Sequence, residues 1–241
     1  MKKIALVSLA ALALPTVAFA QDSSVLPGEF SANVGFVSDY TFRGISQTDE
    51  AAAIQGGIDW SHDSGFHFGV WGSNVDFNEA SPIDGASAEI DVYGGWGQSV
   101  GAFSYDIGFI YYAYPGADSN LDYDFVEGTL KAGYTIVDGL DVGALYAYSP
   151  DFFGGVDEAH YLEGSASYGF DIGLPVTLAA AVGHQWLEGA AIDYLNWSTT
   201  ASVDIDAFTV GLSYRDTDLS KRQCGGDACD ARGVAFVTYS F

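Results

Sequence analysis

The dominant pattern along the chain is an alternation of apolar and polar residues that starts near residue 29 and continues to the C-terminus. In the segment 88–100, for example, apolar residues alternate with Glu89, Asp91 and Tyr93. This period of two is typical of a β-strand with one apolar face. Twelve such segments are present, near the length of about 9 to 11 residues that crosses a bilayer when tilted. In the segment 65–77 we expect the alternation to slip around Gly72.

The connections between these segments also alternate in length. Short turns are expected at 62–65, 97–102, 135–139, 169–175 and 204–207, and longer polar loops at 39–51, 76–87, 114–122, 149–160, 185–193 and 215–232. A soluble β-sandwich shares the alternation of residues but does not need this asymmetry of connections. The sequence therefore predicts an all-β fold, a transmembrane antiparallel up-and-down β-barrel of about 12 strands. Short turns and both termini would face the periplasm, and the longer loops would be extracellular.

The two ends of the chain predict how the protein is exported and assembled. Lys2 and Lys3 precede an apolar run, and Ala18-Phe19-Ala20 forms an A-x-A cleavage site, so residues 1–20 are expected to be a cleaved signal peptide. Residues 21–241 would form the barrel domain. The last strand ends on Tyr239 and Phe241, which resembles the assembly signal of outer-membrane barrels. We therefore expect the bacterial outer membrane as location, with its lipid, lipopolysaccharide and the barrel assembly machinery as partners.

Composition and charge narrow the choice of partner and chemistry. The chain carries 32 Asp and Glu against 8 Lys and Arg, a formal net charge of −24, which excludes nucleic acid as a partner. Thirty glycines and 15% aromatic residues agree with short strands and tight turns. Cys224 and Cys229 are the only cysteines and predict a small disulfide-closed loop. Their spacing is not that of a metal or redox site, and no pattern calls for a metal or cofactor.

Candidate site residues are the charged side chains on the polar face of the strands. The alternation places them in the lumen: Asp59, Glu89, Asp91, Asp106, Glu127, Asp141, Glu163 and Asp204, with Lys131 as the one clear inward base. Carboxylates around a pore favour cations. The alternative is that acids only solvate a surface or bind divalent ions that bridge lipopolysaccharide, which we prefer for the loop acids. Glu89, Asp91, Glu127 and Glu163 would line the upper half of the pore.

Two basic residues have specific expectations. Lys131 is expected to form an internal ion pair with Asp106 or Asp141, because an unpaired ammonium in a narrow lumen is costly. Arg43 could fold inward at a constriction or make an ordinary loop contact with a neighbouring acid. A strand count of 12 leaves open whether the lumen is filled or water-filled. The small inward residues favour a narrow water-filled pore.

A lipid-modifying outer-membrane enzyme is the alternative from another functional class, and the histidines do not support it. His62 and His67 flank a short turn on the periplasmic side, and His160 and His184 lie near the upper rim without a G-x-S-x-G motif. Ser165 and Ser167 share a segment with His160 but are expected to point inward. We expect a protein that is not an enzyme. A non-conducting structural or surface-binding barrel remains a further alternative.

Several stretches resemble a known family. The sequence SDYTFRGISQ at 38–47, QGGIDW at 55–60 and GSNVDF at 72–77 are similar to the N-terminal signature of the TorF-type porins, and EIDVYGG at 89–95 and YAYPG at 112–116 continue the resemblance. The resemblance implies an outer-membrane barrel of the transport class and names no solute. The loop closed by Cys224 and Cys229 departs from it. The expected function is passive passage of small polar, cationic solutes, with the solute and the oligomeric state left open.

Overall fold

The structure is a computed structural model that describes residues 27–77, 85–189 and 191–241. The predicted signal peptide lies outside the described residues. The barrel strands are β1 (Glu29–Val37), β4 (Ala53–Ser61), β5 (Phe66–Asn74), β6 (Ala88–Val100), β7 (Phe103–Ala113), β8 (Phe125–Val137), β9 (Leu140–Ser149), β10 (Ala159–Asp171), β11 (Pro175–Leu187), β12 (Tyr194–Ile205), β13 (Phe208–Thr217) and β14 (Arg232–Ser240). The other elements are β2 (Thr41–Phe42), β3 (Ile45–Ser46), a short 3-10 helix at Ser119–Leu121 and α1 (Lys221–Cys224).

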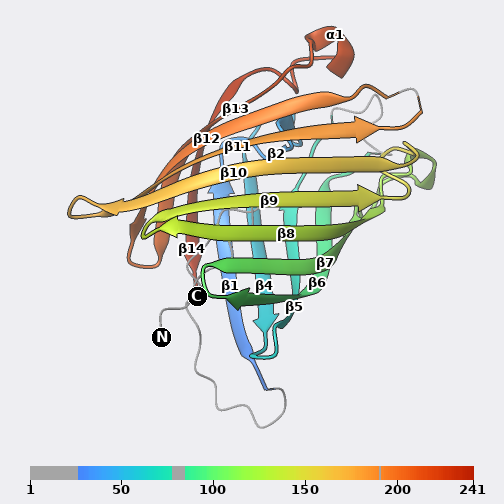
Figure 1. Ribbon diagram of the computed structural model, residues 1–241. Helices are drawn as coiled ribbons and strands as arrows, with labels where there is room; N and C mark the ends of the chain where they lie inside the picture. Colours follow the sequence, from blue (N-terminus) through green and yellow to red (C-terminus); the bar gives the residue numbers. More distant parts are fainter. Residues whose placement is uncertain (1–26, 78–84, 190) are drawn as a thin grey trace.

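The twelve long strands form one closed antiparallel barrel in which each strand pairs with its neighbours (Figure 1). The barrel closes because β1 pairs on one side with β4, where Glu29 lies opposite Ser61, and on the other with β14, where Asn33 lies opposite Ser240. The predicted antiparallel barrel of 12 strands is confirmed. No helix in the described part of the chain is long and apolar enough to cross a membrane.

The predicted alternation of short turns and long loops is also confirmed. The connections at 62–65, 101–102, 138–139, 172–174 and 206–207 are short, and those at 38–52, 75–87, 114–124, 150–158, 188–193 and 218–231 are long. Several strands extend into the predicted turns. β6 reaches Val100, opposite Phe103 of β7, because backbone pairing continues where the side-chain pattern fades. β1 begins and β14 ends on the side of the short turns.

The expected slip in the third segment is wrong. β5 pairs with β4 and β6 in unbroken register, with Gly72 opposite Gly56 on one side and Ile90 on the other. The sequence suggested a slip because Trp71 is a large apolar residue on the inward face. Its ring packs against Tyr40, with ring centroids 5.4 Å apart.

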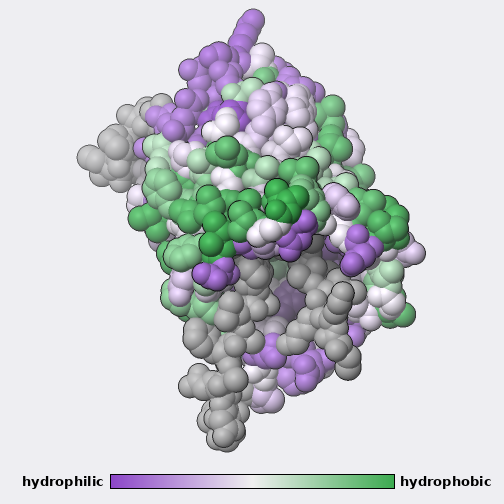
Figure 2. Space-filling view, turned by 90° about the vertical axis from the view of Figure 1, so that its left-hand side faces the viewer, coloured by the Kyte–Doolittle hydropathy of each residue, from purple (hydrophilic) through white to green (hydrophobic). Residues whose placement is uncertain are grey.

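Apolar residues cover the outside of the barrel, whereas the described buried residues are on its inner face or in its loops. Ile54, Ile58 and Leu212 are 66%, 61% and 66% exposed on the outer wall. Figure 2 shows hydrophobic residues gathered over the wall and hydrophilic ones toward the loop at α1. A soluble monomer rarely exposes an apolar surface of this extent. The outer wall therefore requires an apolar surrounding.

Glycines allow large inward rings to lie against the neighbouring strand. The Tyr161 ring of β10 lies over Gly183 of β11, and a Cβ atom at Gly183 would collide with its hydroxyl group. The Tyr93 and Phe236 rings lie in the same way over Gly69 and Gly211. These positions require glycine because of the close approach of a ring, and not because of backbone conformation.

We predict that Gly183→Ala destabilises the barrel by about 1 to 3 kcal/mol, the range found for overpacking. The added methyl group would displace the Tyr161 ring. Gly164→Ala is the matched control, because nothing lies within 4 Å of a Cβ atom at that strand position. The measurement is urea unfolding of the refolded protein. Equal midpoints for the two variants would contradict the prediction.

We predict that deletion of Phe241 impairs assembly of the barrel in cells. The Phe241 backbone N–H donates a hydrogen bond of 2.8 Å to the Ala32 carbonyl across the closing strand pair, and its ring packs edge-on against Tyr239. The measurement is the heat-modifiable, folded fraction in isolated outer membranes. Phe241→Tyr, which keeps ring and backbone, should assemble normally. Fractionation of the full chain as soluble periplasmic material would show that the membrane reading is wrong.

Candidate functional site

All nine charged side chains that the sequence predicts to face the lumen lie at inward positions of their strands. On the long-loop half are Glu89, Asp91, Glu127 and Glu163, and toward the short turns are Asp59, Asp106, Asp141 and Asp204, with Lys131 near the middle of β8. The two halves differ in exposure. The four acids of the long-loop half are buried, whereas Asp59, Asp141 and Asp204 are half-buried.

The acids of the long-loop half are buried because a loop folds into the barrel. The connection 38–52 carries the small hairpin β2–β3, whose tip, Arg43-Gly44, has positive φ angles of 47° and 85°. Glycine is required at the second tip position, because a Cβ atom at Gly44 would collide with Thr217 on the wall. Positive φ at a non-glycine residue such as Arg43 is uncommon and costs conformational energy, which contacts of its side chain must offset.

Arg43 makes those contacts on the wall of the barrel. Its guanidinium donates to both carboxylate oxygens of Glu127 at 2.8 and 2.7 Å and to Oε1 of Gln185 at 2.6 Å. Its central carbon lies 4.1 Å from the ring centroid of Tyr161 and 4.6 Å from that of Phe42. Arg43 thus folds inward, as the first of the two alternatives expects, and its acid partner lies on the wall of the barrel and not in a neighbouring part of a loop.

The ion pair between Arg43 and Glu127 is almost fully removed from water, with side chains 7% and 2% exposed. Burial alone would lower the pKa of the Arg43 guanidinium, but the Glu127 carboxylate and the neighbouring tyrosine hydroxyl groups together raise it, and the pKa lies above its usual value. The guanidinium therefore stays charged. A paired and hydrogen-bonded charge is the form in which burial is tolerated.

A second contact joins the same loop to β6. The Tyr40 hydroxyl donates to Oε1 of Glu89 at 2.8 Å. Burial, together with the negative charges of Glu89 and Asp91, raises the pKa of Tyr40 well above its usual value, so the phenol remains a neutral donor. The other oxygen of Glu89 and one oxygen of Asp91 have no hydrogen-bond partner among the described residues.

Two further arginines anchor the loop, which corrects the expectation that Lys131 is the sole clear inward base. Arg215 of β13 donates to Oγ1 of Thr41 at 2.5 Å, and Arg232 of β14 forms an ion pair with Asp39. The inward direction of both arginines follows from the alternation of their strands, but the sequence pattern reads them as rim and loop residues.

Aromatic rings pack beside the hairpin at the long-loop end. The cluster consists of buried Tyr112, Tyr114 and Phe125 with partly buried Phe42, Phe77, Phe152 and Phe153 around it. Tyr112 and Phe125 stack with centroids 4.2 Å apart. The sequence carries no signal for this cluster, because its members come from four loops and two strands that only the barrel brings together.

In the short-turn half, the carboxylates bond to hydroxyl groups. Asp59 accepts from Tyr93 at 2.5 Å, Asp141 from Thr135 at 2.5 Å and Asp204 from Thr209 at 2.7 Å. A hydroxyl donor stabilises a carboxylate but does not neutralise it. These three carboxylates form no ion pair with a described residue.

The expected ion pair of Lys131 is wrong. No carboxylate of the described residues lies within 4.0 Å of its ammonium group, although Asp106 is its direct partner across the β7–β8 ladder. Asp106 bonds instead to Nε2 of His67 at 2.6 Å. His67 lies at an inward position of β5, two residues beyond the turn. The alternation of β5 already indicates that His67 points inward, so it could have identified His67 as the partner of Asp106. The sequence was interpreted only as placing His67 beside a short turn.

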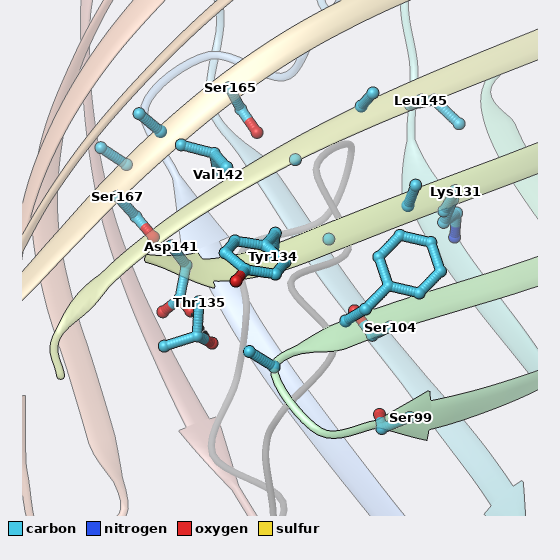
Figure 3. Close-up of a pocket in the computed structure, with 18 of the residues that line it drawn as sticks. Ser99, Ser104, Lys131, Tyr134, Thr135, Asp141, Val142, Leu145, Ser165 and Ser167 are labelled. Atoms are coloured by element: carbon cyan, nitrogen blue, oxygen red, sulfur yellow. Dashed lines mark hydrogen bonds between the residues drawn. The ribbon is translucent and has the colours of Figure 1, made fainter. Parts of the chain in front are cut away.

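A cavity of about 70 Å³ lies beside Lys131 and is lined mainly by small residues, among them several serines, glycines and alanines. Ser104, Ser165 and Ser167 lie along it, and Thr135 and Asp141 lie close together near the β8–β9 turn (Figure 3). Seen from the side of the short turns, the surface is hollowed, with hydrophilic side chains inside the hollow (Figure 2). This half of the lumen carries hydrophilic side chains, whereas the hairpin and the rings lie in the other half.

The cysteine pair and the remaining histidines lie outside the lumen. A disulfide joins Cys224 and Cys229, with Cα atoms 6.2 Å apart, in the last long loop beside α1. Lys221 there pairs with Asp227 and Asp230, each at 2.7 Å. His160 lies at an outward position and bonds to the Tyr146 hydroxyl at 2.7 Å.

The serine and histidine of the enzyme alternative are not brought together. Ser165 and Ser167 are inward positions of β10, whereas His160 is an outward position of the same strand. A nucleophile and its base must be within hydrogen-bond reach. These residues therefore do not form a catalytic pair.

Known structures share the fold at low sequence identity. The KdgM porin, solved in complex with disordered oligogalacturonate, has a TM-score of 0.57 at 11% identity, over 88% of this chain and 99% of that chain. The NanC porin, solved in a rhombohedral crystal form, gives 0.54 at 11%, over 88% and 98%. LpxR from Salmonella typhimurium gives 0.50 at 9%, over 88% and 99%. These likenesses show the fold alone.

The sequence itself identifies the family. No curated protein matches it. A family model described as bacterial protein of unknown function (Gcw_chp) matches residues 20–241. That description does not include the TorF-type name, which stays a resemblance. Because the match covers nearly the whole chain, the protein belongs to the Gcw_chp family of bacterial proteins.

Proposed function

We propose that the protein is an outer-membrane channel for the passive passage of small polar solutes, with a preference for cations. The observation that carries the cation preference is the short-turn half of the lumen. There Asp59, Asp141 and Asp204 are half-buried and bonded only to hydroxyl groups among the described residues. Uncompensated carboxylates facing a narrow lumen with low-dielectric walls concentrate cations.

The barrel wall supports the outer membrane as the proposed location. A closed antiparallel barrel with an apolar outside, short turns on one side and long loops on the other is the form in which strands cross the bacterial outer membrane. The short turns would face the periplasm, and the long loops the outside, together with the disulfide loop. Its partners would be outer-membrane lipid, lipopolysaccharide, the barrel assembly machinery and the solute.

The hairpin β2–β3 would be the constriction. The β1–β4 loop reaches the wall at β8 and β11 through Arg43, which bonds to Glu127 and Gln185. The acids of the long-loop half are buried behind this loop. We therefore assign the proposed cation selectivity to the acids near the short turns, and not to the residues of the upper half from which it was expected. Solutes that enter from outside would meet the hairpin first and the carboxylates second.

The same hairpin favours a second candidate, a barrel that conducts nothing and binds partners through its loops. The aromatic cluster beside Arg43 fills space that a channel would need. Single-channel recording of the refolded protein separates the two candidates. Discrete conductance steps support the channel, and their absence in both the natural chain and the hairpin variants described next supports the non-conducting barrel.

We predict that Glu127→Gln alone destabilises the barrel by about 3 to 5 kcal/mol, because it leaves the buried Arg43 guanidinium without its partner. The double variant Arg43→Met with Glu127→Gln removes both charges, so it should recover much of this loss and release the hairpin. The measurements are urea unfolding and single-channel conductance. Conductance should rise in the double variant.

Lys221→Met is the control, since it breaks an exposed ion pair on α1 away from the lumen. It should leave both stability and conductance nearly unchanged. A double variant with the conductance of the natural chain would show that the hairpin does not limit passage.

We predict that replacing Asp59, Asp141 and Asp204 together by Asn shifts the reversal potential in a salt gradient toward zero. The measurement belongs at low salt, because the Debye length falls from about 30 Å at 0.01 M to about 3 Å at 1 M. Asp227→Asn in the disulfide loop is the control and should change nothing. Anion selectivity of the natural chain at low salt would refute the cation preference.

A further inference from the structure

Two buried carboxyl groups lie next to each other beside the loop that carries the hairpin. Glu89 and Asp91 are inward positions two residues apart on β6, and they are 1% and 9% exposed. Their side chains lie within hydrogen-bonding reach of each other. Oε2 of Glu89 and Oδ1 of Asp91 have no hydrogen-bond partner among the described residues. The other titratable groups of the described chain that face these two side chains are Tyr40, Tyr93, Tyr112, Tyr114 and Glu127.

The groups around Glu89 leave its second oxygen without a donor. Tyr40 of the β1–β4 loop donates to Oε1 at 2.8 Å and not to Oε2. Ser73 of β5 lies opposite Glu89, but its hydroxyl donates to the Asn74 carbonyl at 2.9 Å. Tyr114 also faces Glu89, and its phenol stays neutral because burial raises its pKa. These side chains therefore bring no positive charge to Glu89.

The groups around Asp91 add negative charge and no compensating cation. Tyr112 of β7 lies opposite Asp91, but its hydroxyl donates to Glu127 at 3.1 Å. The Glu127 carboxylate itself faces Asp91. Arg43 donates to Glu127 and to a glutamine, and neither Asp91 nor Glu89 forms an ion pair with a described residue.

Two carboxyl groups in this position do not both remain ionised. Each ionised group would be penalised by its burial and by the charge of the other. One proton between them removes one of the two charges and supplies the missing hydrogen-bond donor, so that one free oxygen donates to the other. A divalent metal ion fits less well, because it requires several oxygen ligands. The described residues contain no group of three or more potential ligands placed to hold one.

We propose that Glu89 and Asp91 share one proton, and that the loss of this proton releases the β1–β4 loop from the wall. The second negative charge would be relieved when water reaches the two groups. The loop covers them, because its Tyr40 bonds to Glu89. The same loop carries the hairpin β2–β3, so the proposed constriction would open at higher pH. Only this last step, the regulation of passage, rests on the proposed function.

The first test is urea unfolding of the refolded protein between about pH 6 and about pH 8, above the range in which free carboxyl groups titrate. A proton bound only in the folded state makes stability fall as the pH rises, and one such proton raises the unfolding constant about tenfold per pH unit. Asp91→Asn and Glu89→Gln each place an amide N–H where the proton lies, so both should lose this tenfold dependence. The four histidines of the chain are common to all variants, so the difference between the chains reports the shared proton.

The second test follows the loop by trypsin cleavage after Arg43, whose side chain is 7% exposed in the docked hairpin. Cleavage after the exposed Lys221 and Arg222 of α1 corrects for the pH dependence of the protease. The released form carries one proton fewer, so the corrected cleavage after Arg43 should rise by up to about tenfold per pH unit in the natural chain. It should stay constant in Asp91→Asn. Single-channel conductance of the natural chain should rise with pH as well.

The control is Glu158→Gln, because Glu158 also accepts from a tyrosine hydroxyl, that of Tyr148, but in an exposed position. It should keep both pH dependences of the natural chain. Heat-modifiable mobility on gels verifies that each variant is folded.

The same pH dependence of unfolding in the natural chain and in both amide variants would overturn the inference, and so would cleavage after Arg43 that does not change with pH. A stability of the natural chain that calcium raises and a chelator removes would also overturn it, because a metal ion would then take the place of the proton. Both pH dependences without conductance would contradict the proposed channel and leave the shared proton and the loop release intact. Conductance without either dependence would do the reverse.

Discussion

The pairing of β1 with β14 is the interaction on which the rest of the structure depends. Each strand of an open sheet has a partner on both sides, except the two edge strands, which have a partner on one side only. In a bilayer the N–H and C=O groups on the free side of each edge strand would be left without hydrogen bonds. The contacts from Val34 opposite Tyr239 to Phe241 against Ala32 remove both edges at once. Closure also fixes which face of each strand turns inward. A shift of one residue in this pair would exchange the two faces of the strand that it joins.

Once closure fixes inside and outside, the lumen must accommodate its charges. The barrel does this differently in its two halves. Near the long loops, Arg43 of the loop pairs with Glu127 on the wall, and Arg215 and Arg232 of the wall bond to Thr41 and Asp39 of the loop. Near the short turns, acids bond to Thr and Tyr hydroxyl groups, and hydrophilic side chains line the hollow. The buried Glu127 carboxylate has a partner of opposite sign, whereas the half-buried carboxylates of Asp59, Asp141 and Asp204 have only hydroxyl donors.

The sequence predicts the barrel far better than it predicts the contacts inside. Strand number, closure and the inward position of residues such as Glu89 and Asp204 follow from a period of two, which is local information. The partner of each charge does not. Asp106 lies opposite Lys131 but bonds to His67, which is 39 residues away. Arg43 reaches Glu127 and Gln185 only because a loop enters the barrel. Loops have no regular alternation of residues, so the sequence pattern does not predict how this loop folds. The slip expected around Gly72 was wrong because Trp71, an apolar residue, lies on the inward face of β5, where its ring packs against Tyr40 of the loop.

The charged hairpin is a less obvious way to fill a lumen than an apolar plug. Replacement of a buried ion pair by apolar side chains of similar size is often neutral or stabilising, so the Arg43–Glu127 contact is weak evidence for a purely structural role. An ion pair of this kind differs from an apolar contact in being directional, because Nη2 of Arg43 donates to both carboxylate oxygens of Glu127 while Nη1 donates to Gln185. Positive φ at Arg43 adds a cost that only this docked position compensates. The hairpin is therefore held in one place by directional contacts that oppose local strain. This arrangement fits the constriction proposed for the hairpin.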